Sequence, residues 1–107
     1  MRIAATADLH FTPQNYDRIR DLMGRVRDEA DILLLAGDLT NYGRPPEMES
    51  LLNAIVRLRI PVVAVLGNHD YESNQQEKLM EMMSAEGIKV LDGTGYERDD
   101  VGFAGTK

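Results

Sequence analysis

Three short apolar runs, each ended by a polar cluster, recur at a fixed spacing along the chain. The runs are residues 3–7, 32–36 and 62–66. Asp8, Asp38 and Asn68 follow them, and consecutive members of this trio are 30 residues apart, the length of one strand and its crossover helix. The second and third runs are continuous rather than alternating, which is typical of parallel strands covered on both faces. Leu34, in the middle of the second run, is therefore predicted to be a core residue.

The segments between the runs carry helical periodicity. Apolar side chains three and four residues apart predict helices over residues 19–26, 48–58 and 79–83. Pro45 and Pro46 open the second helix, where the first turn tolerates proline. Ser73 with Gln76 predicts a capping box at the start of the third helix, and Gly87 suits the position after its end. Alternating strands and helices predict an α/β fold, a mostly parallel βαβαβ sheet with flanking helices.

The end of the chain has a different pattern. Residues 88–91 predict a short strand, and residues 96–98 and 101–104 flank Asp99-Asp100 as a C-terminal hairpin with an acidic turn. A length of 107 residues fits a single domain with one core, so residues 1–107 are expected to form one unit.

Composition excludes several classes of protein. Eighteen acidic residues against twelve basic ones give a net charge of −6, which argues against binding nucleic acid through a basic face. The absence of cysteine excludes disulfides and thiolate sites and fits a reducing compartment. No apolar run suits a signal peptide or a membrane span. The expectation is a cytoplasmic protein without membrane contact.

The polar clusters are expected to meet in space. Parallel strands with a common crossover bring their C-terminal ends to one edge of the sheet, where α/β proteins bind ligands. Asp8, His10, Asp38, Asn68 and His69 should therefore share one crevice. Each of these residues taken singly is a common turn or cap residue. Three clusters at equal spacing indicate instead a shared site for Mn²⁺, Zn²⁺, Fe or Mg²⁺, which accept such oxygen and nitrogen ligands.

These motifs carry a resemblance. Asp8-x-His10, Gly37-Asp38 and the Gly-Asn-His-Asp of residues 67–70 resemble, in this order, the first three motifs of the calcineurin-like metallophosphoesterases. The resemblance implies half of that family's four-layer α/β-β/α sandwich. It also implies that Asp8 and His10 bind one metal, that Asp38 bridges two metals and that Asn68 binds the second. His69 is then the catalytic group, which faces the phosphate and protonates the departing oxygen.

The implied activity is phosphoester hydrolysis with two divalent ions (Mn²⁺, Fe, Zn²⁺ or similar) and a hydroxide that bridges them. Two cations about 3.5–4 Å apart polarise phosphoryl oxygens and lower the pKa of the water between them. A carboxylate such as Asp38 can fix their spacing because each oxygen can take one ion. Histidine titrates in the range that an acid at the leaving group needs.

The sequence departs from the family at the positions expected to support His69, the predicted proton donor. Members that resemble protein phosphatases carry an acidic residue and then Arg where this chain has Asn41 and Tyr42. Asn41 is expected to accept a hydrogen bond from His69 without raising its pKa as a carboxylate would. Arg44 is near enough in sequence to replace the missing phosphate ligand, and Asp70 either orients a neighbour or begins a turn.

The ligand set is expected to be incomplete. The family's remaining ligands are histidines, and this chain has only His10 and His69. We therefore expect residues 1–107 to be the first half of the domain, with an incomplete second metal site. A sheet face left bare by the missing half should favour self-association.

Two other functions stay open from sequence alone. The chain could be a truncated, non-catalytic module that binds a metal or a protein partner. It could also be a phosphoacceptor signalling domain of flavodoxin-like build, which shares the acid at a strand end. That class needs paired acids after the first strand and a lysine after a later one, and the sequence shows neither.

Overall fold

A parallel sheet runs through the molecule in chain order. Its strands are β1 (Ile3–Thr6), β2 (Ile32–Ala36), β3 (Val62–Val65) and β4 (Lys89–Val90). Leu34 pairs with Ala5 on one side and Val63 on the other, so the three long strands are in step. The computed structural model describes all of residues 1–107. The strand order β1-β2-β3-β4 confirms the predicted parallel α/β sheet.

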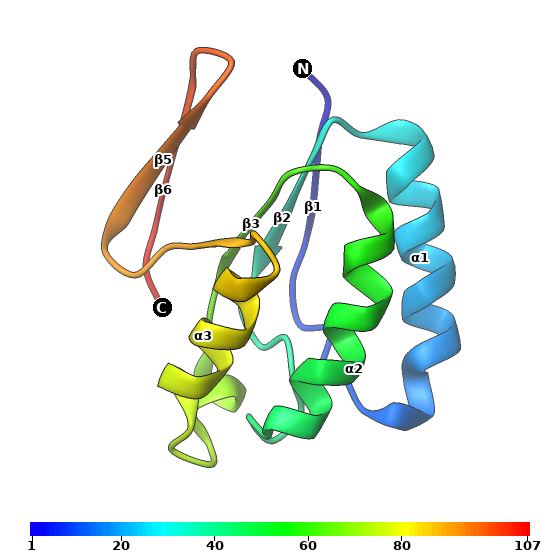
Figure 1. Ribbon diagram of the computed structural model, residues 1–107, viewed down its shortest axis with the longest axis vertical. Helices are drawn as coiled ribbons and strands as arrows, with labels where there is room; N and C mark the ends of the chain where they lie inside the picture. The colour runs from blue at the N-terminus through cyan, green and yellow to red at the C-terminus, as the bar shows by residue number, and fades with distance from the viewer.

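Three helices fill the crossovers and lie on one side of the sheet (Figure 1). They are α1 (Tyr16–Glu29), α2 (Pro45–Ile55) and α3 (Gln76–Ala85). Short 3-10 turns are η1 (Pro13–Asn15), η2 (Val56–Leu58) and η3 (Asn68–Tyr71). None of the helices combines the length and the apolarity of a transmembrane span.

The three predicted helices are present, although α2 ends at Ile55 and the predicted residues 56–58 form the 3-10 turn η2. Helix α2 begins at Pro45, and Gly87 follows the end of α3 with a φ of 82°. The capping box at α3 was a wrong prediction, because the helix has no side-chain cap hydrogen bond. The Ser73 hydroxyl instead donates to the main-chain carbonyl of Tyr42 at 2.7 Å, which ties the start of α3 to the loop after β2.

The main core lies between the sheet and the helices. Leu33 and Leu35 of β2 point into it and are almost completely buried. They share this core with side chains from all three helices, among them Met23, Met48, Leu51, Leu79 and Met83. Burial of each such side chain contributes about 1.5–3 kcal/mol. This core fixes the strand ends from which the polar loops start.

The opposite face of the sheet is covered only in part. A hairpin of β5 (Thr94–Arg98) and β6 (Val101–Gly105) lies on that side (Figure 1). Tyr96 and Phe103 pack from it against a small cluster of sheet residues. The hairpin confirms its prediction, and its turn residues Asp99 and Asp100 are both left-handed, as a two-residue turn requires.

The expectation that both faces of the strands are covered is therefore wrong for part of the sheet. Leu34 is half-buried on the face away from the helices, and Ile3 is 47% exposed. A continuous apolar run shows that side chains on both faces are suited to burial. It does not show that another helix or strand covers each face. Self-association through this face stays a prediction.

Substitutions on the two faces of β2 should lower the free energy of unfolding by different amounts. Leu33→Ala should cost about 2–5 kcal/mol, because a filled core loses the contacts of an isopropyl group on the helix side. Leu34→Ala, on the half-covered face, should cost about 1–2 kcal/mol, since part of its side chain already meets water. Urea unfolding of the two variants measures the difference directly. Equal losses would show that the face away from the helices is as well covered as the core.

Candidate active site

The loops after β1 and β2 stay paired beyond the ends of the strands. The main-chain N–H of Asp8 donates to the Gly37 carbonyl at 3.0 Å, and that of His10 donates to the Asp38 carbonyl at 2.9 Å. An isolated parallel bridge continues this pairing at Phe11. The two polar clusters are therefore held side by side by the backbone, before any ligand binds.

The backbone at these positions is strained. Asp8, His10 and Asp38 have φ values of 56°, 44° and 50°, in the left-handed region that side chains other than glycine rarely adopt. Such a conformation costs about 1–2 kcal/mol per residue. Residues held in this way cluster at functional sites, where surrounding contacts impose the conformation. Asp adopts this conformation more readily than most residues, so Asp8 and Asp38 suit these backbone positions.

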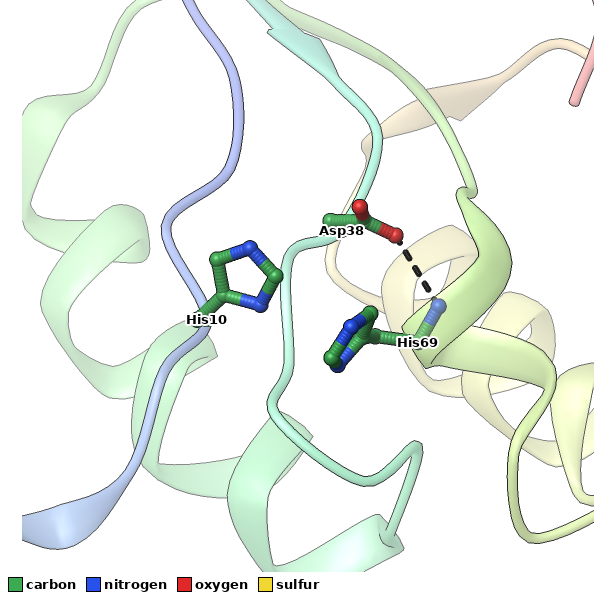
Figure 2. Close-up of side chains that lie close together, drawn as sticks. All are labelled: His10, Asp38 and His69. Carbon is green, nitrogen blue, oxygen red and sulfur yellow. Dashed lines mark hydrogen bonds between the residues drawn. The ribbon is translucent and has the colours of Figure 1, made fainter.

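His10, Asp38 and His69 converge at this edge of the sheet. One potential ligand atom from each lies within 4.8 Å of the other two (Figure 2). The imidazole rings meet edge to face, with centroids 4.4 Å apart. Because metal bonds to imidazole and carboxylate are about 2.0–2.2 Å long, ligands of one ion lie less than about 4.4 Å apart. Two imidazoles and a carboxylate at this spacing fit one divalent ion after small side-chain rotations.

Asp8 and Asn68, the other two residues predicted to meet here, are both exposed. Asp8 is exposed and is not among the three converging side chains. Asn68 is exposed at the first position of η3. Their assignment as metal ligands stays a prediction. His69 joins the group that can bind metal, a role that differs from the one the family resemblance implies for it.

A buried carboxylate behind the group joins two of the loops. Asp70 is completely buried, and its Oδ1 accepts hydrogen bonds from the main-chain N–H and the hydroxyl of Thr40, at 2.8 and 2.7 Å. Its Oδ2 accepts from the main-chain N–H groups of Leu39 and Gly67, at 3.1 and 2.9 Å. Asp70 thus both starts the turn after β3 and binds the loop after β2. The sequence offered no signal for Thr40.

Gly67 lies against the carboxylate of Asp38. A β-carbon at position 67 would collide with both the main-chain nitrogen and Oδ1 of Asp38. The close approach lets the main-chain N–H of His69 donate to the same Oδ1 at 2.9 Å, as Figure 2 shows. Asp38 is therefore fixed from the β3 side as well as by its own loop.

Comparison with known proteins agrees with this geometry. The sequence profile of the calcineurin-like phosphoesterases matches residues 1–101. The chain belongs to this family. Its parallel sheet and helices are consistent with the N-terminal half of the family's fold.

Curated members of the family resemble the chain over part of their length. The glycerophosphodiester phosphodiesterase GpdQ of Enterobacter lignolyticus is 31% identical over 83 residues, which cover 65% of this chain and 30% of that protein. The probable cyclic nucleotide phosphodiesterase syc0937_d of Synechococcus is 34% identical over 92 residues, or 77% of this chain and 34% of its own. The chain thus spans about a third of the length of these relatives.

At this site, His69 is held by the loop after β2. Its Nδ1 lies 2.7 Å from the main-chain carbonyl of Asn41. This hydrogen bond raises the pKa of His69, and the nearby carboxylates of Asp38, Glu72 and Asp70 raise it further, while partial burial acts in the opposite direction. The expected contact with Asn41 is present, but through the backbone. The main-chain carbonyl supports the charged form of His69 whatever the side chain at position 41.

Arg44 contacts the neighbouring Tyr42. Its guanidinium stacks on the ring of Tyr42, 4.9 Å from the centroid. The Oε1 atom of the buried Glu47 accepts the main-chain N–H groups of both residues, which fixes the start of α2. A role for Arg44 in phosphate binding stays a prediction.

Removal of the Asp70 carboxylate should loosen the whole site. Asp70→Ala leaves three main-chain N–H groups and a hydroxyl buried without an acceptor, so it should lower the free energy of unfolding by at least about 3 kcal/mol. Asp92→Ala is the matched control, because that side chain is exposed and its carboxylate makes no hydrogen bond or ion pair. Its effect should stay within about 0.5 kcal/mol. A small loss for Asp70→Ala in urea unfolding would contradict this role of the carboxylate.

The environment of His69 predicts a pH dependence in the metal-free chain. An NMR titration should give His69 a pKa above the ordinary 6.5, and Asp38→Asn should lower it because an attracting charge is removed. Since the folded-state pKa is the higher one, the stability that His69 contributes is complete below pH 6.5 and is lost as the pH rises through the folded-state value. A pKa at or below 6.5 would show that partial burial outweighs the carbonyl.

Proposed function

We propose that this chain supplies the first metal-binding and proton-donating side chains of a metal-dependent phosphodiesterase. The observation that carries the proposal is the convergence of His10, Asp38 and His69 at the carboxyl ends of three parallel strands. Phosphodiester substrates are favoured because relatives of the chain are named as phosphodiesterases. As in the family resemblance, Asp38 is assigned to both of two ions, with Asp8 and His10 on one of them and Asn68 on the other.

The bound ions would polarise the phosphoryl oxygens and supply hydroxide near neutral pH. The chain's own residues prepare the place for them. Asp38 Oδ1 is already fixed by the N–H of His69, so the carboxylate keeps one orientation. Asp70 holds the two loops together from below and remains fully hydrogen-bonded, so it does not compete as a ligand.

His69 is assigned the role of proton donor to the leaving oxygen. When its ring is charged, Nδ1–H donates to the Asn41 carbonyl and Nε2–H is left for the substrate. The raised pKa of His69 keeps this form populated closer to neutral pH, so Nε2 can donate to the oxygen that leaves phosphorus. The same nitrogen would otherwise be free to bind a metal, which is the competing assignment.

The chain alone should bind one ion rather than two. Asp8, His10 and Asp38 would hold the first ion, whereas the second would have only Asp38 and Asn68. Calorimetry with Mn²⁺ should therefore give one weak site per chain, and phosphodiester hydrolysis should stay near the rate of Mn²⁺ alone. Asp38→Asn should abolish binding, while the exposed Asp28, which contacts only Arg27, serves as the control through Asp28→Asn.

The second half of this experiment separates the roles of His69. If His69 donates a proton, His69→Asn should leave Mn²⁺ binding unchanged; if it is a ligand, binding should fall together with that of Asp38→Asn. Binding that survives Asp38→Asn would refute the assigned site. Two tight ions with robust hydrolysis of bis(p-nitrophenyl) phosphate would show that copies of the chain complete one another.

A further inference from the structure

A cavity of about 410 Å³ lies next to the site, between the loop after β1 and helix α1. Asp8 lines it from the loop, and Arg18, Leu22 and Arg25 line it from the helix. Asp8 thus belongs both to the polar edge of the sheet and to this cavity. A ligand that reaches Asp8 from the strand ends can extend along the helix.

The two arginines face the cavity without an acidic partner. They are seven residues apart, which places them on one face of α1. The ion pairs of the structure involve Arg2, Arg20 and Arg27, and neither Arg18 nor Arg25 takes part in one. The chain has eighteen acidic residues for twelve basic ones. Two guanidinium groups without an ion pair beside one cavity offer this acidic surface a place for an anion.

The acidic groups in the cavity do not cancel this charge once the site is loaded. Asp21 also lines the cavity, but Arg20 lies 3.8 Å from its carboxylate on the same helix. Asp8 is assigned to a metal ion by the proposed function. With Asp8 bound to a cation and Asp21 next to Arg20, the cavity is left with the positive charge of Arg18 and Arg25.

We propose that this cavity binds a second anionic group of the substrate, separate from the phosphoryl group that is cleaved. The substrate class is then a phosphoester whose alcohol carries a carboxylate or another phosphate. Arginine suits such groups because its planar guanidinium donates two parallel hydrogen bonds to one carboxylate or phosphate. Leu22 provides an apolar contact for the part of the alcohol between the two anions. The proposal rests on the proposed function for the place of the scissile group.

The test compares two ligands that differ in one carboxylate. Phenyl phosphate and 4-carboxyphenyl phosphate are titrated into the ¹⁵N-labelled chain loaded with Zn²⁺, which is diamagnetic. The carboxylate should improve affinity about tenfold, or 1.4 kcal/mol. It should also shift the side-chain N–H signals of Arg18 and Arg25. Without Zn²⁺ the advantage should shrink, because the charge of Asp8 is then free.

The variants identify the residues responsible. In the double variant Arg18→Gln, Arg25→Gln the two ligands should bind equally. Arg27→Gln is the matched control, since Arg27 lies on the same helix beside Asp28 and does not line the cavity, and it should keep the tenfold preference. All three substitutions are at exposed positions, and circular dichroism checks that the fold is retained.

The possible results of these titrations separate the subsite from the metal site. Equal affinity of the two ligands in the original chain overturns the subsite, as does a preference that Arg27→Gln removes to the same extent as the double variant. If phenyl phosphate binds with Zn²⁺ and only the preference is absent, the subsite fails while the proposed function stands. If the chain binds no Zn²⁺ but keeps the arginine-dependent preference, the anion site stands and the proposed function fails.

Discussion

The carboxylate of Asp70 is the contact on which the geometry of the site depends. It accepts four hydrogen bonds from two separate loops and has no contact with water. Hydrogen bonds to a charged group contribute about 1.5–3 kcal/mol each, and an unpaired buried charge would cost several times as much. Asp70 therefore stabilises the loops after β2 and β3 only in one relative position. That position brings Asp38 and His69 together.

The strained backbone at the strand ends depends on this support. Three residues with side chains hold left-handed conformations there, at a combined cost of several kcal/mol. The main-chain pairing of the loops and the contacts around Asp70 offset the cost. In these conformations, His10 and Asp38 converge with His69 at one edge of the sheet. The site is thus ordered by the fold before it meets a ligand, and a metal would bind a prepared set of groups.

The sequence was most informative where chemistry recurs at a fixed period. The 30-residue spacing predicted that five side chains would meet, because parallel crossovers return to the same edge of a sheet. Of these, His10, Asp38 and His69 converge, whereas Asp8 and Asn68 stay predictions. It could not show that His69 is supported by the carbonyl of residue 41, since a carbonyl is present whatever the side chain. Nor could it show that Leu34 is half-exposed, because an apolar run reports suitability for burial and not the element that covers it.

Contact between Gly67 and Asp38 has a consequence for how this chain can vary. Any side chain at position 67 would occupy the space of the Asp38 carboxylate or push the two loops apart. Substitution of Gly67 is therefore expected to disrupt the site around Asp38, although residue 67 itself offers no functional group. A library screened for activity should keep glycine there as strictly as aspartate at position 38. The space that a β-carbon at position 67 would fill is needed for the Asp38 carboxylate of the candidate site.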